Sequence, residues 1–286
     1  MTIEKISLGQ FTVYGLRDGY FYLDGGSMFG VVPKILWEKI YTPDEKNRIK
    51  MGLNSLLVQT KQDLVLIETG IGPQLDQKFS NFYSVVQSPG LLGELKNLGV
   101  NADDIDFVIN THLHFDHCGG NTHRNEKGEY VPTFPKARYV IQRGEWDYAL
   151  HPCYRDKPSY MSENFLPLEK FGLLQLVDGD AEIIPGVEVL LASGHTSRHQ
   201  CVKITSEGKV LFFLGDMVPM SAHVGLSYIM SYDLYPLETL ENKEKYFEVA
   251  IAEDWIVAFV HDPQLFFGRI GKNEDKYFAL SLERRD

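Results

Sequence analysis

The chain has 286 residues, of which 44% are hydrophobic and 23% charged, a balance that is ordinary for a folded globular protein. Its formal net charge of −11 argues against a surface that follows nucleic-acid phosphates, and so against nuclease and other nucleic-acid-binding functions. The 3 cysteines give no disulfide framework, the first residues carry no secretory signal, and no apolar run reaches the ~20 residues that cross a bilayer, so we expect a cytoplasmic protein without a membrane partner.

The N-terminal part of the chain is predicted to begin with β-structure. Residues 6–23 alternate apolar and polar positions around Gly15 and Gly19, which indicates a β-hairpin or meander. The glycine-rich segment 24–34 is expected to form a loop. The sequence Thr-Pro-Asp-Glu at 42–45 combines an N-cap residue, a proline at the first helical position and a capping-box glutamate, and it therefore predicts the start of a helix.

From residue 54 onward, predicted strands and helices alternate. Strands are predicted over 54–59, 64–70, 107–110, 137–142, 173–177, 182–192, 200–205, 209–214 and 255–260, and helices over 88–98, 144–150 and 233–253. This rhythm favours α/β architecture, and because nothing resembles a linker or a repeat, we expect one domain over residues 1–286. Residues 151–172 lack clean periodicity and form either a connecting loop with aromatic anchors or a cap over a substrate site.

The most informative stretch is 111–120, Thr-His-Leu-His-Phe-Asp-His-Cys-Gly-Gly, which lies where a buried strand ends and a loop begins. It places candidate metal ligands close together: His112, His114, Asp116 and His117. The first two histidines point the same way if the strand conformation continues, and the aspartate and last histidine follow in the turn. Imidazole and carboxylate groups at this spacing suit zinc and similar divalent metals. Cys118, beside them, is expected to be a small packing residue.

Further motifs follow the first one along the chain. They are Gly194-His195-Thr196, Leu214-Gly215-Asp216 and His261-Asp262. Together with His112-x-His114-x-Asp116-His117, they resemble the signature of the metallo-β-lactamase-fold hydrolases, and this resemblance implies an αββα sandwich, in which two sheets pack face to face with helices outside. Within that superfamily, residues 24–34, Trp37 and residues 44–47 resemble one bacterial branch of the quorum-quenching N-acyl-homoserine lactonases. The likeness extends from about residue 18 to residue 261.

The resemblance gives each candidate ligand a role. One metal ion would be bound by three histidines, His112, His114 and His195. A second ion would be bound by an aspartate and two histidines, Asp116, His117 and His261. Asp216 would bridge the ions with one carboxylate oxygen each, so the expected cofactors are two divalent ions per chain, zinc first, with manganese, iron or cobalt as alternatives. Candidates that directly follow predicted apolar strands are well placed to converge on one sheet edge: His112, His195, Asp216 and His261.

The same resemblance implies a reaction. A water held between two divalent ions becomes a hydroxide nucleophile near neutral pH, and a carbonyl oxygen resting on one ion is polarised. This predicts a hydrolase that opens lactone rings, with N-acyl-homoserine lactones as substrates and Asp116 and Asp216 as the catalytic carboxylates. The alternatives are another ester, thioester or phosphotriester hydrolase on this fold, and a metal-binding protein without catalysis. The expected partners are a small lactone or ester and, in a homodimer, a second copy of the chain.

Some positions depart from the pattern of the lactonases. Glu68 stands where the family usually has an aspartate that orients a metal-binding histidine, and we expect it to keep that type of role. Many lactonases have a tyrosine three residues after the bridging aspartate, where this chain has Pro219. His223 is therefore the candidate catalytic donor or acid, with a surface or core histidine as the alternative. The other histidines outside the motifs are expected to be structural or exposed: His123, His151 and His199.

The segment 24–34 has two interpretations, a surface loop with a few buried anchors or, as in the resembling lactonases, an apolar wall over the substrate. In the second interpretation an acyl chain would be contacted by Met28, Phe29, Val31 and Val32, together with Tyr154, Tyr160 and Phe165. A chain buried there would gain about 0.8 kcal/mol per methylene, so catalytic efficiency is expected to rise from short to medium acyl chains.

Overall fold

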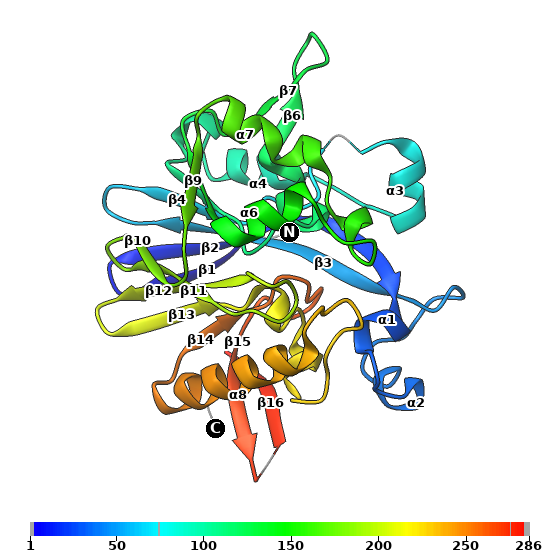
Figure 1. The fold of residues 1–286 in the computed structure, drawn as a ribbon. Coiled ribbons are helices and arrows are strands. Elements are labelled where there is room, and N and C mark those ends of the chain that lie inside the picture. The colour runs from blue at the N-terminus through cyan, green and yellow to red at the C-terminus, as the bar shows by residue number, and fades with distance from the viewer. Residues whose placement is uncertain (1–2, 74, 275, 283–286) are drawn as a thin grey trace.

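The fold consists of two β-sheets that pack face to face. The computed structural model describes residues 3–73, 75–274 and 276–282, so the predicted domain limits at residues 1 and 286 lie outside the described residues. Helices cover the outer face of each sheet, and Figure 1 shows the layers one above another. The predicted αββα sandwich is confirmed.

The first sheet has seven strands. In spatial order they are β1 (Glu4–Leu8), β2 (Phe11–Asp24), β3 (Arg48–Gln59), β4 (Leu64–Ile67), β5 (Phe107–Ile109), β8 (Arg138–Gln142) and β9 (Leu174–Val177). The strands from β1 to β4 are antiparallel to their neighbours, whereas β4, β5, β8 and β9 are parallel to one another. The carboxyl ends of the parallel strands therefore meet at one edge of this sheet.

The second sheet also has seven strands. They are β10 (Ala181–Ile184), β11 (Val187–Leu191), β12 (Gln200–Ser206), β13 (Lys209–Phe213), β14 (Ile256–Ala258), β15 (Phe267–Asn273) and β16 (Lys276–Ser281). Neighbouring strands are antiparallel except β13 and β14, which run parallel and so end at the same edge. A separate hairpin is formed by β6 (Thr122–Arg124) and β7 (Tyr130–Pro132).

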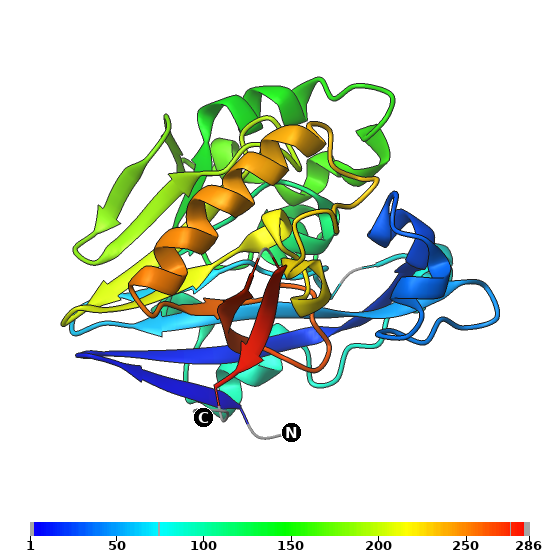
Figure 2. The same ribbon diagram turned by 90° about the horizontal axis from the view of Figure 1, so that it is seen from below.

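Successive side chains along each strand point to opposite faces of its sheet, and this alternation forms the layers of the core. In β13, Leu211 and Phe213 point into the core between the sheets, whereas Phe212 points outward and packs against the helix that covers the second sheet. That helix is α8 (Pro236–Ala252), which Figure 2 shows lying across the sheet. The first sheet is covered on its outer face by α4 (Leu91–Asn97), α6 (Arg143–Leu150) and α7 (Leu166–Lys170).

Short helices connect these layers. The α-helical ones are α1 (Gly25–Phe29), α2 (Lys34–Trp37), α3 (Gln77–Tyr83) and α5 (Phe115–Cys118). The 3-10 helices are η1 (Ala102–Asp104), η2 (Gly119–Asn121), η3 (Lys157–Ser159), η4 (Ser162–Asn164), η5 (Gly215–Met217) and η6 (Ser221–Val224). Within the described ranges, no helix is both long and apolar enough to cross a membrane.

Two predictions near the N-terminus are wrong. The expected loop over 24–34 begins with α1, because Oδ1 of Asp24 accepts a hydrogen bond from the Ser27 N–H at 2.8 Å and so caps the helix. The expected helix start at 42–45 is a turn instead. Oδ1 of Asp44 accepts hydrogen bonds from the N–H groups of Lys46 and Arg48 at 2.9 and 2.8 Å, which directs the backbone into β3 rather than into a helix.

The opening hairpin is confirmed, but it turns at residues 9–10, and Gly15 and Gly19 lie inside β2. The strand register shifts at Gly19, where a Cβ atom would lie 2.3 Å from the carbonyl oxygen of Val86, so only glycine admits this close approach. The predicted strand over 182–192 divides into β10 and β11. The other predicted strands and helices are present with shifted ends. The further α-helices and strands without a predicted counterpart are α2, α3, α5, α7, β6, β7, β15 and β16.

The two sheets are joined where β3 meets the segment after β14. The side-chain amide of Asn54, which is buried in β3, donates to the carbonyl oxygens of Phe259 and Asp262 at 2.8 and 2.9 Å. The backbone N–H of Gly52 donates to the carbonyl oxygen of His261 at 2.7 Å. These bonds fix the segment that carries His261 against the first sheet.

We expect Asn54→Ala to lower the free energy of unfolding by about 2 kcal/mol, because two buried carbonyl groups lose their donor. Urea denaturation followed by circular dichroism measures the change. Gln62→Ala, in an exposed turn, is the control and should stay within about 0.5 kcal/mol of the parent. An Asn54→Ala protein as stable as the parent would contradict a role for this side chain in joining the sheets.

Candidate metal centre

The candidate ligands lie together at the ends of strands from both sheets. His112 follows β5 in the first sheet, whereas His195, Asp216 and His261 follow strands β11, β13 and β14 of the second sheet. The remaining candidates lie in the turn and helix after His112. None of the predicted ligands exposes more than 9% of its surface. Residues far apart in the sequence thus converge because rigid strand ends bring them to one place.

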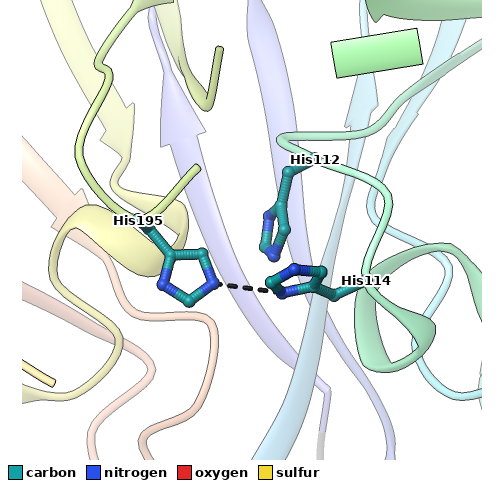
Figure 3. Close-up of side chains that lie close together, drawn as sticks. All are labelled: His112, His114 and His195. Atoms are coloured by element: carbon teal, nitrogen blue, oxygen red, sulfur yellow. Dashed lines mark hydrogen bonds between the residues drawn. The ribbon is translucent and has the colours of Figure 1, made fainter. Parts of the chain in front are cut away.

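Three histidines form a first group. Nδ1 of His114 lies 3.1 Å from Nε2 of His195, and Figure 3 shows these two rings facing each other with the ring of His112 beside them. One ring nitrogen from each of the three side chains lies within 4.8 Å of the others, which is close enough for a shared metal ion. The structure therefore brings together the set predicted for the first ion.

Asp116, His117 and His261 form a second group. The Nε2 atoms of His117 and His261 are 3.1 Å apart, and Oδ2 of Asp116 lies 3.4 Å from Nε2 of His261. These three ligand atoms also lie within 4.8 Å of one another. This group matches the set predicted for the second ion.

Asp216 lies between the two groups. Its Oδ2 atom is 3.2 Å from Nε2 of His195 in the first group and 3.5 Å from Nε2 of His117 in the second. Its Oδ1 atom is 3.3 Å from Nε2 of His261. The carboxylate thus contacts both groups, as the prediction of a bridging ligand requires.

The nitrogen atoms that face the groups fit a bound cation. The Nε2 atom of His112, which lies 4.0 Å from Oδ2 of Asp216, is buried and has no hydrogen-bond partner within the described ranges. Buried polar atoms are rarely left unpaired, and two imidazole nitrogens 3.1 Å apart need either a proton or a metal ion between them. Imidazole and carboxylate donors together fit a borderline divalent ion such as zinc.

The outer ring nitrogens of His195 and His261, by contrast, have partners. Nδ1 of His195 lies 3.0 Å from Oδ1 of Asp233, and Nδ1 of His261 lies 2.8 Å from the carbonyl oxygen of Gly52. Such acceptors hold the proton on Nδ1, so the lone pair of Nε2 faces the group, as in metal-binding histidines. Asp233 was predicted only as the start of a helix, and nothing in the sequence around it indicates this contact.

The electrostatics of the groups fit metal binding as well. Burial, together with the neighbouring imidazoles, lowers the pKa of His112 and of His114 well below the usual range, so both rings are neutral. Burial opposes ionisation of Asp216, but His117, His195 and His261 outweigh it and hold the pKa of this carboxyl well below its usual range. Burial opposes protonation of His117 and His195, but Asp216 outweighs it and raises the pKa of both rings. A divalent cation bound there would take the place of these protons, because imidazole coordinates a metal in its neutral form.

Two further buried carboxylates position the ligand loops. Oε1 of Glu68 accepts the Thr111 N–H at 2.8 Å and lies 3.6 Å from Nδ1 of His117, so this side chain contacts both the start of the first motif and one of its histidines. Glu145 accepts hydrogen bonds from the Leu113 N–H at 3.1 Å and the Thr196 hydroxyl at 2.7 Å. The carboxylate of Glu145 therefore ties the first motif to the loop that carries His195.

A cavity of about 780 Å³ opens in front of both groups, and its floor includes His114, His195 and Asp216. Its walls come from segments that are distant in the sequence: β2 with α1, the end of α3, residues 155–159 and residues 230–232. Its apolar and aromatic lining includes Met28, Phe82, Tyr83, Phe115, Met230 and Tyr232. The site thus combines polar candidate ligands at the floor with walls that carry apolar side chains and also charged ones, among them Lys46, Arg48 and Arg155.

The predicted wall and cap residues contribute only in part. Met28 lines the cavity, but Phe29 is fully buried behind it and stacks on Trp37 with ring centroids 5.3 Å apart, while Val31 is 89% exposed. Tyr154 is exposed, Tyr160 packs its ring edge-on against His114, and Phe165 lies in the core. From 151–172, the residues on the cavity are Arg155, Asp156, Pro158 and Ser159, which favours the cap interpretation of this segment.

One wall of the cavity is held by a buried cation. Lys243 of α8 is fully buried, and its ammonium group donates to the carbonyl oxygens of Gly225, Leu226 and Tyr228 at 2.7, 3.3 and 3.1 Å. Residues 230–232, which line the cavity, follow directly. The conformation of this wall is therefore fixed by a helix residue that does not itself face the cavity.

His223 lies outside the residues that line the cavity. Its Nε2 atom is 2.8 Å from the carbonyl oxygen of Met28, and its ring stacks on Phe29 with centroids 4.8 Å apart. Burial lowers the pKa of His223 to about 4, so the ring is neutral near pH 7 and its Nε2–H donates to that carbonyl. These contacts hold α1 and favour the interpretation of His223 as a core histidine, while its catalytic role stays an untested prediction.

The other residues outside the ligand set mostly match the predictions. His199 is buried, and its Nε2 atom accepts the backbone N–H of Asp216 at 3.0 Å, so it positions that carboxylate. Cys118 is buried in the core of the first sheet, as expected for a packing residue. His151 is exposed and His123 half-buried.

The family of the chain follows from comparison with known proteins. Residues 50–261, which include all of the candidate ligands, match the sequence profile of the metallo-beta-lactamase superfamily. This chain belongs to that superfamily.

Individual relatives refine this result. The chain is 29% identical to an N-acyl homoserine lactonase of Bacillus thuringiensis over 167 residues, which are 54% of this chain and 60% of that protein, so the match spans about three fifths of that relative's length. A probable metal-dependent hydrolase from Staphylococcus aureus has a crystal structure with a TM-score of 0.89 and 31% identity, over 98% of this chain and 99% of that chain. AidC, a dizinc quorum-quenching lactonase in complex with a product, shares the fold with a TM-score of 0.80 and 21% identity, over 99% and 98% of the two chains.

We expect His223→Gln to lower the free energy of unfolding by about 1 kcal/mol, because the stacking on Phe29 is lost, and to leave kcat for hydrolysis within about threefold of the parent. Chemical denaturation and steady-state kinetics measure the two quantities. His151→Gln, at an exposed position, is the matched control. A loss of kcat by two orders of magnitude with stability unchanged would instead support the catalytic role of His223.

Proposed function

We propose that this protein is a metal-dependent hydrolase that opens the lactone ring of N-acyl homoserine lactones. The observation that carries the proposal is the pair of buried ligand groups that share Asp216 at the floor of a cavity. Membership of the metallo-beta-lactamase superfamily supports hydrolysis as the class of reaction. The likeness to the lactonase of Bacillus thuringiensis supports the substrate.

The residues present would hold two divalent metal ions. The first would be bound by His112, His114 and His195. The second would be bound by Asp116, His117 and His261. Asp216 would be shared between them. When bound, such ions supply a water molecule that ionises near neutral pH and a Lewis acid for the carbonyl oxygen of an ester.

The side chains of the protein contribute orientation. Asp233 and the carbonyl of Gly52 hold the rings of His195 and His261, so their Nε2 lone pairs stay directed at the groups. His199 holds the backbone of Asp216 in place. Because these contacts exist before substrate binds, no rearrangement of ligands is needed when charge develops on the substrate.

The cavity favours a neutral substrate with an apolar chain. Met28, Phe115 and Met230 line it, and an acyl chain that displaces water there gains about 0.8 kcal/mol per methylene. The net charge of −11 disfavours polyanionic substrates through long-range repulsion. An N-acyl lactone combines such a chain with an ester that can reach the floor of the cavity.

We expect about two divalent metal ions per chain in protein purified without chelator, because the candidate ligands form two sets. Elemental analysis by mass spectrometry measures the content. Removing the ions with a chelator should abolish hydrolysis, and adding zinc, manganese or cobalt back should restore it. Full activity with one ion or fewer per chain would refute the shared role of Asp216.

The substrate is tested by ring opening of N-acyl homoserine lactones with short, medium and long acyl chains, followed by acid release and by mass spectrometry of the product. We expect kcat/KM to rise from short to medium chains. Asp216→Asn should lower kcat/KM by at least about a thousandfold, or ~4 kcal/mol of transition-state stabilisation, while the circular dichroism spectrum is retained. Asp147→Asn, an exposed carboxylate on α6, is the control.

A panel of simple esters, thioesters and phosphotriesters is assayed beside the lactones. Turnover of one of these classes without ring opening of any lactone would reject the lactonase proposal and favour the corresponding alternative hydrolase.

A further inference from the structure

Asp156 has one carboxylate oxygen that no group of the protein uses. The side chain lines the cavity and is only 7% exposed. Its Oδ1 atom accepts hydrogen bonds from the Tyr148 hydroxyl at 3.0 Å and the Cys153 thiol at 3.3 Å. Its Oδ2 atom is buried and has no hydrogen-bond partner within the described ranges.

This unpaired oxygen is unusual for a folded protein. Leaving a buried acceptor without a donor costs about 1–3 kcal/mol, and more when the group is charged. Asp156 directly precedes η3, where an aspartate often caps the helix, yet its side chain makes no such bond. Because Asp156 lines the cavity, a small rotation of its side chain would present this oxygen to a donor that enters the cavity.

Neighbouring aromatic side chains place this carboxylate on the same side of the cavity as the first ligand group. The ring of Tyr148, whose hydroxyl holds Oδ1, packs edge-on against the ring of Tyr160 with centroids 5.8 Å apart. The ring of Tyr160 packs edge-on against His114 with centroids 4.7 Å apart. Asp156 and His114 both line the cavity, so a substrate that reaches its floor can contact both residues.

The adjacent cation is engaged elsewhere. The guanidinium group of Arg155 donates to the carbonyl oxygen of Ser231 at 2.5 Å, across the cavity mouth. The structure records no ion pair between Asp156 and a described lysine or arginine within 4.0 Å. The oxygen is thus left for an uncharged donor on the substrate, and the amide N–H of an N-acyl lactone is a donor of this kind.

We propose that Oδ2 of Asp156 accepts a hydrogen bond from the amide N–H of the substrate and so selects N-acyl lactones over lactones that lack this donor. The inference rests on the proposed lactonase function. Asp156 is then a specificity residue: it binds the acylamino group, and the ligand groups at the floor of the cavity act on the ester. A site built to satisfy a donor rejects an analogue without it, because a buried acceptor is then left unpaired.

The test compares two substrates that differ in this donor alone. They are N-hexanoyl homoserine lactone and its ester analogue, α-hexanoyloxy-γ-butyrolactone, in which oxygen replaces the amide N–H. Ring opening by the metal-loaded parent protein, with products identified by mass spectrometry, should be about tenfold more efficient in kcat/KM for the amide, the ratio that one good hydrogen bond gives.

Asp156→Ala removes the acceptor, and in Asp156→Asn the remaining oxygen would accept from Tyr148 and Cys153 while an NH2 group, which cannot accept the N–H, takes the place of Oδ2. We expect each to lower kcat/KM for the amide by about tenfold, mainly through KM, and to change the ester analogue by less than about twofold. Asp147→Asn, an exposed aspartate on α6, is the matched control and should change neither value. Because the preference of the parent protein is itself a prediction, a variant that fails to fold does not remove the test.

The outcomes separate this inference from the proposed function. If the parent protein opens neither lactone, the proposed function fails. If it opens both lactones with equal efficiency, or if the Asp156 variants slow both substrates alike, the selection of the amide by Asp156 is overturned while the lactonase function stands.

Discussion

The structure depends on holding seven polar side chains, which water would otherwise solvate, at a fixed spacing in the interior. Burial of unpaired imidazole and carboxylate groups is costly, so each must be oriented by contacts that persist without substrate. Both sheets contribute, because the ligands follow strands of the first and second sheet alike. Hydrogen bonds from Asn54 and Gly52 then hold the segment around His261 against β3. The contact between the two sheets and the position of this candidate ligand therefore depend on the same bonds.

The layer order and the convergence of the candidate ligands could be predicted from the sequence because both depend on local patterns. The first motif places its ligands within a few residues, and apolar strands before His195, Asp216 and His261 indicate where those side chains lie. The groups that orient them could not be predicted in the same way. Asp233 contacts His195, which is 38 positions away in the sequence, and Glu145 contacts Leu113, which is 32 positions away. No local sequence pattern distinguishes either residue from an ordinary helix carboxylate.

The walls of the cavity show a second limit of sequence patterns. Phe29 and Val31 are apolar neighbours of Met28, yet capping by Asp24 winds this segment into α1, and of these three side chains Met28 alone lines the cavity. The aromatic wall comes instead from Phe82 and Tyr83 at the end of α3, a helix without any buried residue and therefore without an amphipathic signal. The positions of the candidate ligands are thus easier to predict from the sequence than the shape of the cavity, because that shape depends on turns and short helices.

The buried ammonium of Lys243 has a consequence for how such a protein can change over evolutionary time. It donates hydrogen bonds to three carbonyl groups of the segment that leads into Met230 and Tyr232. Lys243 itself belongs to α8, on the outer side of the second sheet. The shape of the cavity can therefore be changed by substitutions at residues that no ligand contacts. Mutations in α8 would alter the shape of the cavity while every candidate ligand and every side chain that lines the cavity stayed the same.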